Sequence, residues 1–146
     1  IFFGLIAVPG TYYLQSKIFF ELNSILLGSS IGFIAVAILC VNNIRDIDSD
    51  AKVGKKTLAV RFGAYRITLL YDIMIICAYL SIIILIFING VYNQLGLFLL
   101  FLSFPIALQL MIDIHKKTGK ELNLILVRTA ALLRTFSILL IIGIII

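Results

Sequence analysis

The chain has 146 residues, of which 62% are hydrophobic and only 13% are charged, and its mean hydropathy is +1.19. A water-soluble domain cannot bury so much apolar surface, so the composition excludes an ordinary soluble fold. The formal charge of +5 does not indicate nucleic-acid binding, because the basic residues are confined to short stretches between apolar runs.

Five apolar runs follow one another along the chain, and lipid forces runs of this kind to form α-helices. Residues 73–112 contain no charged side chain, which leaves room for two crossings of about 20 residues each and a turn. We therefore predict an all-α, polytopic transmembrane helical bundle that forms a single domain over residues 1–146. Its five expected spans are residues 1–14, 22–41, 65–88, 95–112 and 122–146.

The loops between these runs alternate in charge. Residues 42–63 and 113–121, with the helix ends beside them, carry almost all of the basic side chains, whereas residues 15–21 and 89–94 carry only Lys17. The positive-inside rule then predicts that the first two loops are cytoplasmic. Because the chain begins inside an apolar run without the basic segment of a signal peptide, we expect it to be a fragment whose N-terminal half is missing.

An aspartate-rich segment directly follows the second expected span. If the helix continues through it, Asn42, Asp46 and Asp50 recur at intervals of four residues and line one face. These hard oxygen ligands suit Mg²⁺. Asp48 would then point elsewhere, toward bound water or a second ion.

Basic side chains lie on both sides of these acids. Arg45 precedes Asp46, and Lys52, Lys55 and Lys56 follow Asp50. Cations beside a carboxylate–magnesium site are what a diphosphate group requires.

The segment has two other interpretations. It could be a solvated cytoplasmic loop whose charges only fix the topology. It could also be an EF-hand, but Ala51 stands where the turn glycine belongs and Thr57 where the bidentate glutamate belongs, so that interpretation fails.

The same segment carries a family resemblance. The pattern Asn-Asn-x-Arg-Asp at residues 42–46 and the pattern Gly-Lys-x-Thr-Leu-Ala-Val-Arg at residues 54–61 resemble the second aspartate-rich motif of the UbiA superfamily of intramembrane prenyltransferases. Within it they most resemble the branch that acts on 1,4-dihydroxy-2-naphthoate in menaquinone synthesis. The upstream Gly4 and the run Tyr-Tyr-Leu-Gln at residues 12–15 fit the same branch.

This resemblance implies a bundle of nine transmembrane helices, of which the chain would be the C-terminal part. It implies Mg²⁺-dependent transfer of a polyprenyl chain from polyprenyl diphosphate to the aromatic acceptor, which gives a demethylmenaquinol. The first aspartate-rich motif of the family has no counterpart here, so we expect the chain alone to be inactive and to need its missing N-terminal half. We also expect a bacterial or archaeal cell membrane, with the loop at 42–63 on its cytoplasmic side.

The resemblance also assigns residues to roles. The implied catalytic residues are Asp46, Asp50 and Lys52. The implied magnesium ligands are Asp46, Asp48 and Asp50. The implied substrate-binding residues are Asn42, Arg45, Lys56 and Arg134. Lys55 and Arg61 match the motif as well, but a purely topogenic charge explains them equally.

Three polar residues outside the motif are further candidates for a functional role. Arg134 lies deep in the last expected span, where a charge costs about 2.5–3.5 kcal/mol on insertion scales, so we expect it to face the cavity and to hold the acceptor's carboxylate or pair with a missing helix. For Asp72 we expect a local hydrogen bond with Thr68. For His115 we expect a solvated side chain without an acid beside it.

Alternatives to this function remain. Another UbiA-type enzyme would act on 4-hydroxybenzoate, homogentisate, haem or chlorophyllide. A transporter-like bundle would merely bind a cation, although transporters more often place ionisable groups at the bilayer midplane. A CDP-alcohol phosphotransferase would need an Asp-Gly…Ala-Arg…Gly pattern, which is absent.

Overall fold

The computed structural model describes residues 6–18 and 21–146, and in these ranges every regular element is a helix. In chain order the elements are α1 (Val8–Ser16), α2 (Leu22–Arg45), α3 (Ile47–Lys52), α4 (Leu58–Phe62), α5 (Ala64–Asn89), the 3₁₀ helix η2 (Val91–Ser103), α6 (Phe104–Ile114), the short 3₁₀ turn η3 (Gly119–Glu121) and α7 (Leu122–Ile145). The all-α prediction is thus confirmed for the described residues.

Four helices in the described ranges are long and apolar enough to cross a membrane. They are Leu22–Arg45, Ala64–Asn89, Gln94–Ile114 and Gly119–Ile145. The prediction of five spans is wrong for this part of the chain, because α1 has only nine residues and so reaches about 14 Å, roughly half of the hydrocarbon thickness. Residues 1–5 of the first expected span, including Gly4, lie outside the described residues.

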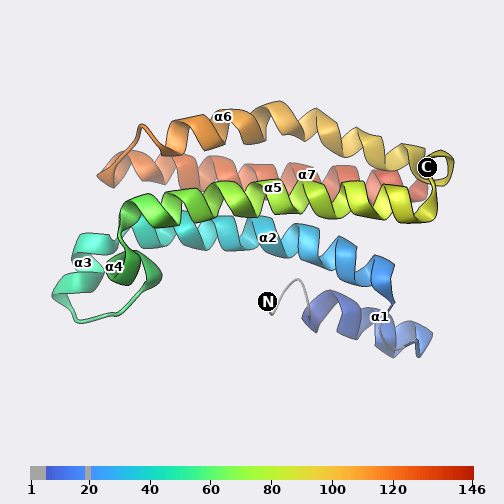
Figure 1. The fold of residues 1–146 in the computed structure, drawn as a ribbon, viewed down its shortest axis with the longest axis horizontal. Coiled ribbons are helices and arrows are strands. Elements are labelled where there is room, and N and C mark those ends of the chain that lie inside the picture. Colours follow the sequence, from blue (N-terminus) through green and yellow to red (C-terminus); the bar gives the residue numbers. More distant parts are fainter. Residues whose placement is uncertain (1–5, 19–20) are drawn as a thin grey trace.

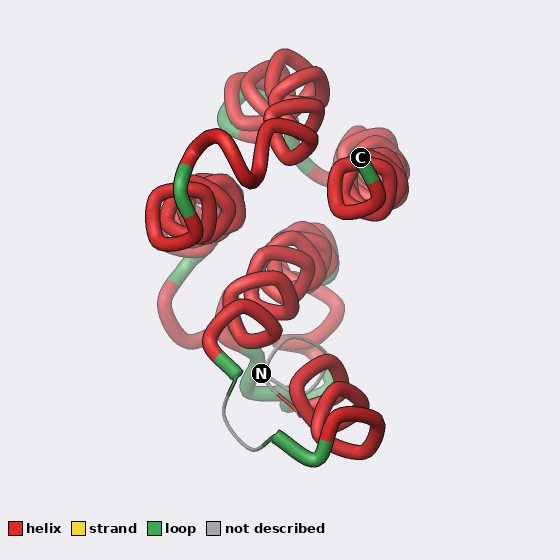
Figure 2. The backbone as a smooth tube through the Cα atoms, turned by 90° about the vertical axis from the view of Figure 1, so that its right-hand side faces the viewer, coloured by secondary structure: helices red, strands yellow, loops and turns green. Residues whose placement is uncertain are grey.

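The four long helices run side by side along the longest axis of the molecule, as Figures 1 and 2 show from two directions. Helix α2 packs most extensively on α5, and α7 packs on both η2 and α2. The core between them is apolar and includes Ile34, Tyr71, Ile75, Leu132 and Phe136, all fully buried. Large apolar side chains such as Phe87 and Val127 are exposed, as expected where lipid replaces water.

Buried hydroxyl groups also join the helices. Tyr71 of α5 is 3.0 Å from Thr129 of α7, and Tyr79 of α5 is 2.8 Å from Ser103 at the end of η2, in each case between hydroxyl oxygens. The ring of Tyr79 further meets the edge or face of Phe136 with centroids 5.4 Å apart. These contacts fix the positions of η2 and α7 against α5, because a polar group in lipid needs a partner within the protein.

The two polar connections lie at the same end of the bundle. Figure 1 shows α3 and α4 at the end where α6 passes into α7, whereas the turn between α5 and η2 lies at the opposite end. A left-handed glycine, Gly90 with φ 86°, makes that opposite turn. The fold therefore gathers the aspartate-rich segment and the start of α7 at one end.

The close crossing of η2 and α7 generates a prediction. A Cβ atom added at Gly143 would lie 2.6 Å from the carbonyl oxygen of Gly96, so Gly143→Ala must push the two helices apart. We expect the free energy of unfolding to fall by about 1–3 kcal/mol, measured by reversible SDS denaturation in detergent micelles.

The matched control is Gly10→Ala in α1, where an added Cβ meets nothing within 4 Å. Equal unfolding free energies for the two variants would contradict the close approach.

Candidate functional site

The backbone carries α2 almost without interruption into the aspartate-rich segment. The amide of Asp46 donates to the carbonyl of Asn42 at 3.0 Å, and the amide of Asp50 donates to the carbonyl of Asp46 at 2.8 Å. Asp46 itself leaves the helical region, with φ −95° and ψ 9°, and separates α2 from α3. Asn42, Asp46 and Asp50 are thus joined by helical backbone hydrogen bonds, as expected, but the chain bends at Asp46.

Asp46 is held by its own chain neighbour. The Nε and Nη2 atoms of Arg45 each donate to a different carboxylate oxygen of Asp46, both at 2.7 Å. Adjacent side chains of a regular helix do not face each other, so the bend at Asp46 is what allows this bidentate pair. These hydrogen bonds from Arg45 hold the pKa of Asp46 below its ordinary value, and the charges of Arg45 and Lys55 act in the same direction.

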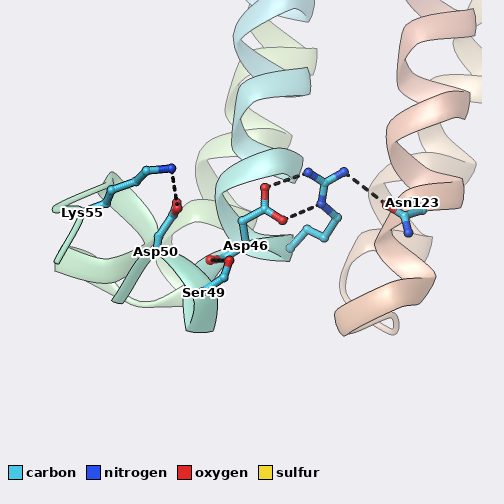
Figure 3. Close-up of polar contacts among 6 residues, drawn as sticks. Asp46, Ser49, Asp50, Lys55 and Asn123 are labelled. Carbon is cyan, nitrogen blue, oxygen red and sulfur yellow. Dashed lines mark hydrogen bonds and ion pairs between the residues drawn. The ribbon is translucent and has the colours of Figure 1, made fainter. Parts of the chain in front are cut away.

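Asp50 is paired separately. Asp50 is only 8% exposed, and its Oδ1 lies 3.2 Å from the ammonium group of Lys55. Figure 3 shows the Asp50 carboxylate turned toward Lys55 and the Asp46 carboxylate turned to the other side. From the sequence, Lys55 could have been either part of the motif or only a charge that fixes the topology. In the structure it is the partner of a buried carboxylate.

The remaining motif residues divide by exposure. Asp48, Lys52, Lys56 and Arg61 are exposed, whereas Asn42 is half-buried. Within the described ranges neither Lys52 nor Lys56 takes part in an ion pair. These two ammonium groups are therefore available for an anionic ligand.

The segment has the kind of ligand atoms that magnesium needs, but too few of them are close together. Carboxylate and amide oxygens are the ligands that Mg²⁺ takes, yet no three His, Cys, Asp or Glu side chains among the described residues are close enough to hold a metal ion together. Magnesium is usually held by one or two carboxylates, with substrate phosphates and water completing the octahedron. Asp46 and Asp50 supply oxygen ligands of this kind, but in this structure each carboxylate is paired with a basic side chain and the two point to different sides.

Arg134 is not brought to the aspartate-rich segment. It lies on the exposed side of α7, twelve positions after the helix begins and so about 18 Å along its axis. Among the described residues it makes no hydrogen bond or ion pair. The expectation that Arg134 faces a cavity stays a prediction, because none of the described helices covers that side of α7.

Of the other two expectations outside the motif, the one for Asp72 is wrong and the one for His115 is wrong in part: the histidine is exposed, as expected, but it has an acidic partner. Thr68 donates to the carbonyl of Ala64 at 3.1 Å rather than pairing with Asp72. Asp72 instead lies 2.6 Å from Nε2 of His115, so an acid does stand beside this histidine. Local spacing could not reveal the pair, since its members are 43 positions apart.

A second ion pair lies at the same end of the bundle. Asp113 of α6 is 3.4 Å from Nη1 of Arg128 in α7, and 4.0 Å from Nζ of Lys117. With Asp72 and His115 it ties α5, α6 and α7 together beside the aspartate-rich segment. From the sequence alone, Asp113, Lys117 and Arg128 are only charges in or beside a loop.

These features define a class of protein: a polytopic membrane protein in which most acidic and basic groups gather at one end of a lipid-embedded helical bundle. The model of the UbiA prenyltransferase family matches residues 1–144. The chain belongs to this family. The resemblance seen in the motif is thereby confirmed, and a transporter-like bundle or a CDP-alcohol phosphotransferase is disfavoured.

Curated relatives share part of the chain. A 1,4-dihydroxy-2-naphthoate octaprenyltransferase of Haemophilus influenzae is 53% identical over 66 residues, which are 45% of this chain and 21% of that protein. The enzyme of the same name from Escherichia coli K12 is 44% identical over 63 residues, 43% of this chain and 20% of its own.

The one from Bacillus subtilis is 36% identical over 107 residues, 73% of this chain and 33% of its own. The matched stretches thus cover about a fifth to a third of these relatives. No solved structure matches the chain significantly.

The pair of Asp72 and His115 generates a prediction. His115→Ala leaves a half-buried carboxylate without its partner, so we expect the free energy of unfolding to fall. In a double-mutant cycle with Asp72→Asn, the coupling energy should be about 1 kcal/mol, reduced by the exposure of the imidazole. The measurement is SDS denaturation of the four proteins in one detergent.

Lys116→Ala, an exposed neighbour, serves as the control. A coupling energy indistinguishable from that between Asp72→Asn and Lys116→Ala would show that the contact is absent in the membrane.

Proposed function

We propose that the protein transfers a polyprenyl chain from polyprenyl diphosphate to 1,4-dihydroxy-2-naphthoate. The observation that carries this proposal is the aspartate-rich segment: two paired carboxylates and two unpaired lysines at the end of a lipid-embedded bundle of the UbiA family. The names of the curated relatives support the choice of acceptor. Another UbiA-type acceptor would use the same segment.

The chemistry needs charge neutralisation in an apolar setting. Bound Mg²⁺ would neutralise the departing diphosphate. Asp46 and Asp50 would hold the metal, with Asp48 and Asn42 in support. The prenyl carbon leaves its diphosphate oxygen and is attacked by the electron-rich ring, which loses its carboxylate as carbon dioxide.

Basic side chains would bind the negatively charged diphosphate that leaves. Lys52 and Lys56 are exposed and free of ion pairs, so they can bind diphosphate oxygens without first losing a partner. Arg45 is the third candidate. The surrounding apolar helices accept the prenyl chain and keep water away from the cationic carbon.

Arg134 is the proposed anchor for the aromatic acceptor. Its exposed position on α7 and its lack of a partner among the described residues mean that an anionic group, either the acceptor's carboxylate or an acid of another helix, must neutralise it in lipid.

The whole activity also requires further helices. The matched stretches cover at most about a third of the curated relatives, and two carboxylates alone cannot complete the coordination of the magnesium ions that would neutralise a diphosphate. We propose a nine-helix enzyme of a bacterial or archaeal cell membrane to which a preceding N-terminal half contributes the first aspartate-rich motif.

In the full-length enzyme we expect Asp46→Asn or Asp50→Asn to reduce prenyl transfer at least 100-fold, because each removes a ligand charge from the metal. Membrane insertion should be unaffected. Turnover is measured with polyprenyl diphosphate and 1,4-dihydroxy-2-naphthoate over a range of magnesium concentrations.

Glu121→Gln, an exposed acid at the same end of the bundle, is the matched control and should retain activity. Lys52→Ala and Lys56→Ala should mainly raise KM for the prenyl diphosphate. Near-normal turnover of both aspartate variants at saturating magnesium would refute the metal role.

The charge distribution predicts the orientation of the chain. Single cysteines at Ser49 and Thr118, in a background that lacks Cys40 and Cys77, should react with a membrane-impermeant maleimide only after the cells are opened. A cysteine at Val91, which is exposed at the opposite end, should react in intact cells. Labelling of Ser49→Cys and Val91→Cys from the same side would contradict this orientation.

A further inference from the structure

A contact between distant parts of the chain bears on the aspartate-rich segment. Nη1 of Arg45 donates to Oδ1 of Asn123 at 3.2 Å, across 78 positions of sequence. Asn123 is the second residue of α7, and Figure 3 shows its side chain reaching from that helix toward the end of α2. The start of the last span is thus linked to the motif by one hydrogen bond.

The bond is not explained by helix capping. Asparagine near the start of a helix commonly caps free backbone amides, but the N-cap position of α7 is Glu121, and no side-chain cap bond is made there. Asn123 is also exposed, so its hydrogen bond contributes little to the stability of the bundle. Its side chain is directed to Arg45 instead.

The donors of Arg45 are only partly used. A guanidinium group carries five N–H donors in a fixed plane. Nε and Nη2 each bind an oxygen of Asp46, and Nη1 binds Asn123. Two N–H donors therefore have no partner among the described residues, and Arg45 can bind an anion without releasing Asp46 or Asn123.

The hydrogen bond from Arg45 to Asn123 matters because of the position of Arg45 in the chain. Arg45 is the last residue of α2, and the backbone bends at the next residue. The bidentate pair fixes Arg45 only relative to Asp46, and Asp46 is itself the residue at which the backbone bends. A contact from α7 fixes the guanidinium plane against a separate helix, and an error of about 1 Å in such a group can cost on the order of 100-fold in rate.

We propose that Asn123 is a positioning residue that holds the Arg45 guanidinium so that its two free N–H donors meet the diphosphate of the prenyl donor. This inference rests on the proposed function for its substrate. It concerns the link between Asn123 and Arg45, and that link can be tested by binding of inorganic diphosphate alone.

The experiment uses the full-length enzyme in detergent or nanodiscs. Asn123→Ala should lower kcat/KM for polyprenyl diphosphate about tenfold, because a displaced guanidinium binds the diphosphate less well, while KM for the aromatic acceptor and the melting temperature stay unchanged. Affinity for inorganic diphosphate with magnesium, measured by calorimetry, should fall by a similar factor. Leu124→Ala, exposed in the same turn of α7, is the control.

The decisive arm repeats Asn123→Ala in an Arg45→Lys background. Lysine lacks the planar fork of donors, so the asparagine should then have nothing to position and its loss should add no further effect. Equal losses in both backgrounds, an unchanged diphosphate affinity, or a fall in melting temperature that accounts for the loss would overturn the proposal.

The two proposals fail separately. A wild-type enzyme that binds diphosphate through Arg45, with an affinity that depends on Asn123, but transfers no prenyl group would refute the proposed function and keep this inference.

Discussion

The bidentate pair of Arg45 and Asp46 lies where a lipid-spanning helix becomes a polar segment. Three carboxylates within five residues repel one another unless cations neutralise them, and the structure neutralises Asp46 with Arg45 and Asp50 with Lys55. The bend at Asp46 makes the first pair possible. Without it, the end of α2 would carry unpaired charge at the membrane boundary.

The rest of the bundle brings α7 to this segment. Close approach at Gly96 and Gly143 and the buried hydroxyl pair of Tyr71 and Thr129 set α7 against η2 and α5. In lipid such packing and hydrogen bonding, rather than the hydrophobic effect, hold helices together. As a result Asn123, at the start of α7, reaches the guanidinium of Arg45.

Composition and pattern were enough to predict the all-α fold and its four long spans, because lipid leaves a long apolar run no other structure. They also predicted a fifth span, which the nine residues of α1 are too short to form. They failed where tertiary contacts decide. Asp72 pairs with His115 on another helix, and Arg45 pairs with its own neighbour Asp46 only because the helix bends there. The surroundings of Arg134 depend on what covers the exposed side of α7, which its spacing in the sequence cannot specify.

The central claim is that Asp46 and Asp50 hold the metal that neutralises the diphosphate. Manganese in place of magnesium makes that contact visible, since Mn²⁺ broadens the ³¹P resonances of a phosphate that shares its coordination sphere. With the full-length enzyme in nanodiscs, we expect strong broadening of the polyprenyl diphosphate signals, largely lost in the Asp46→Asn/Asp50→Asn double variant. Equal broadening in the wild-type and double-variant proteins would contradict the account.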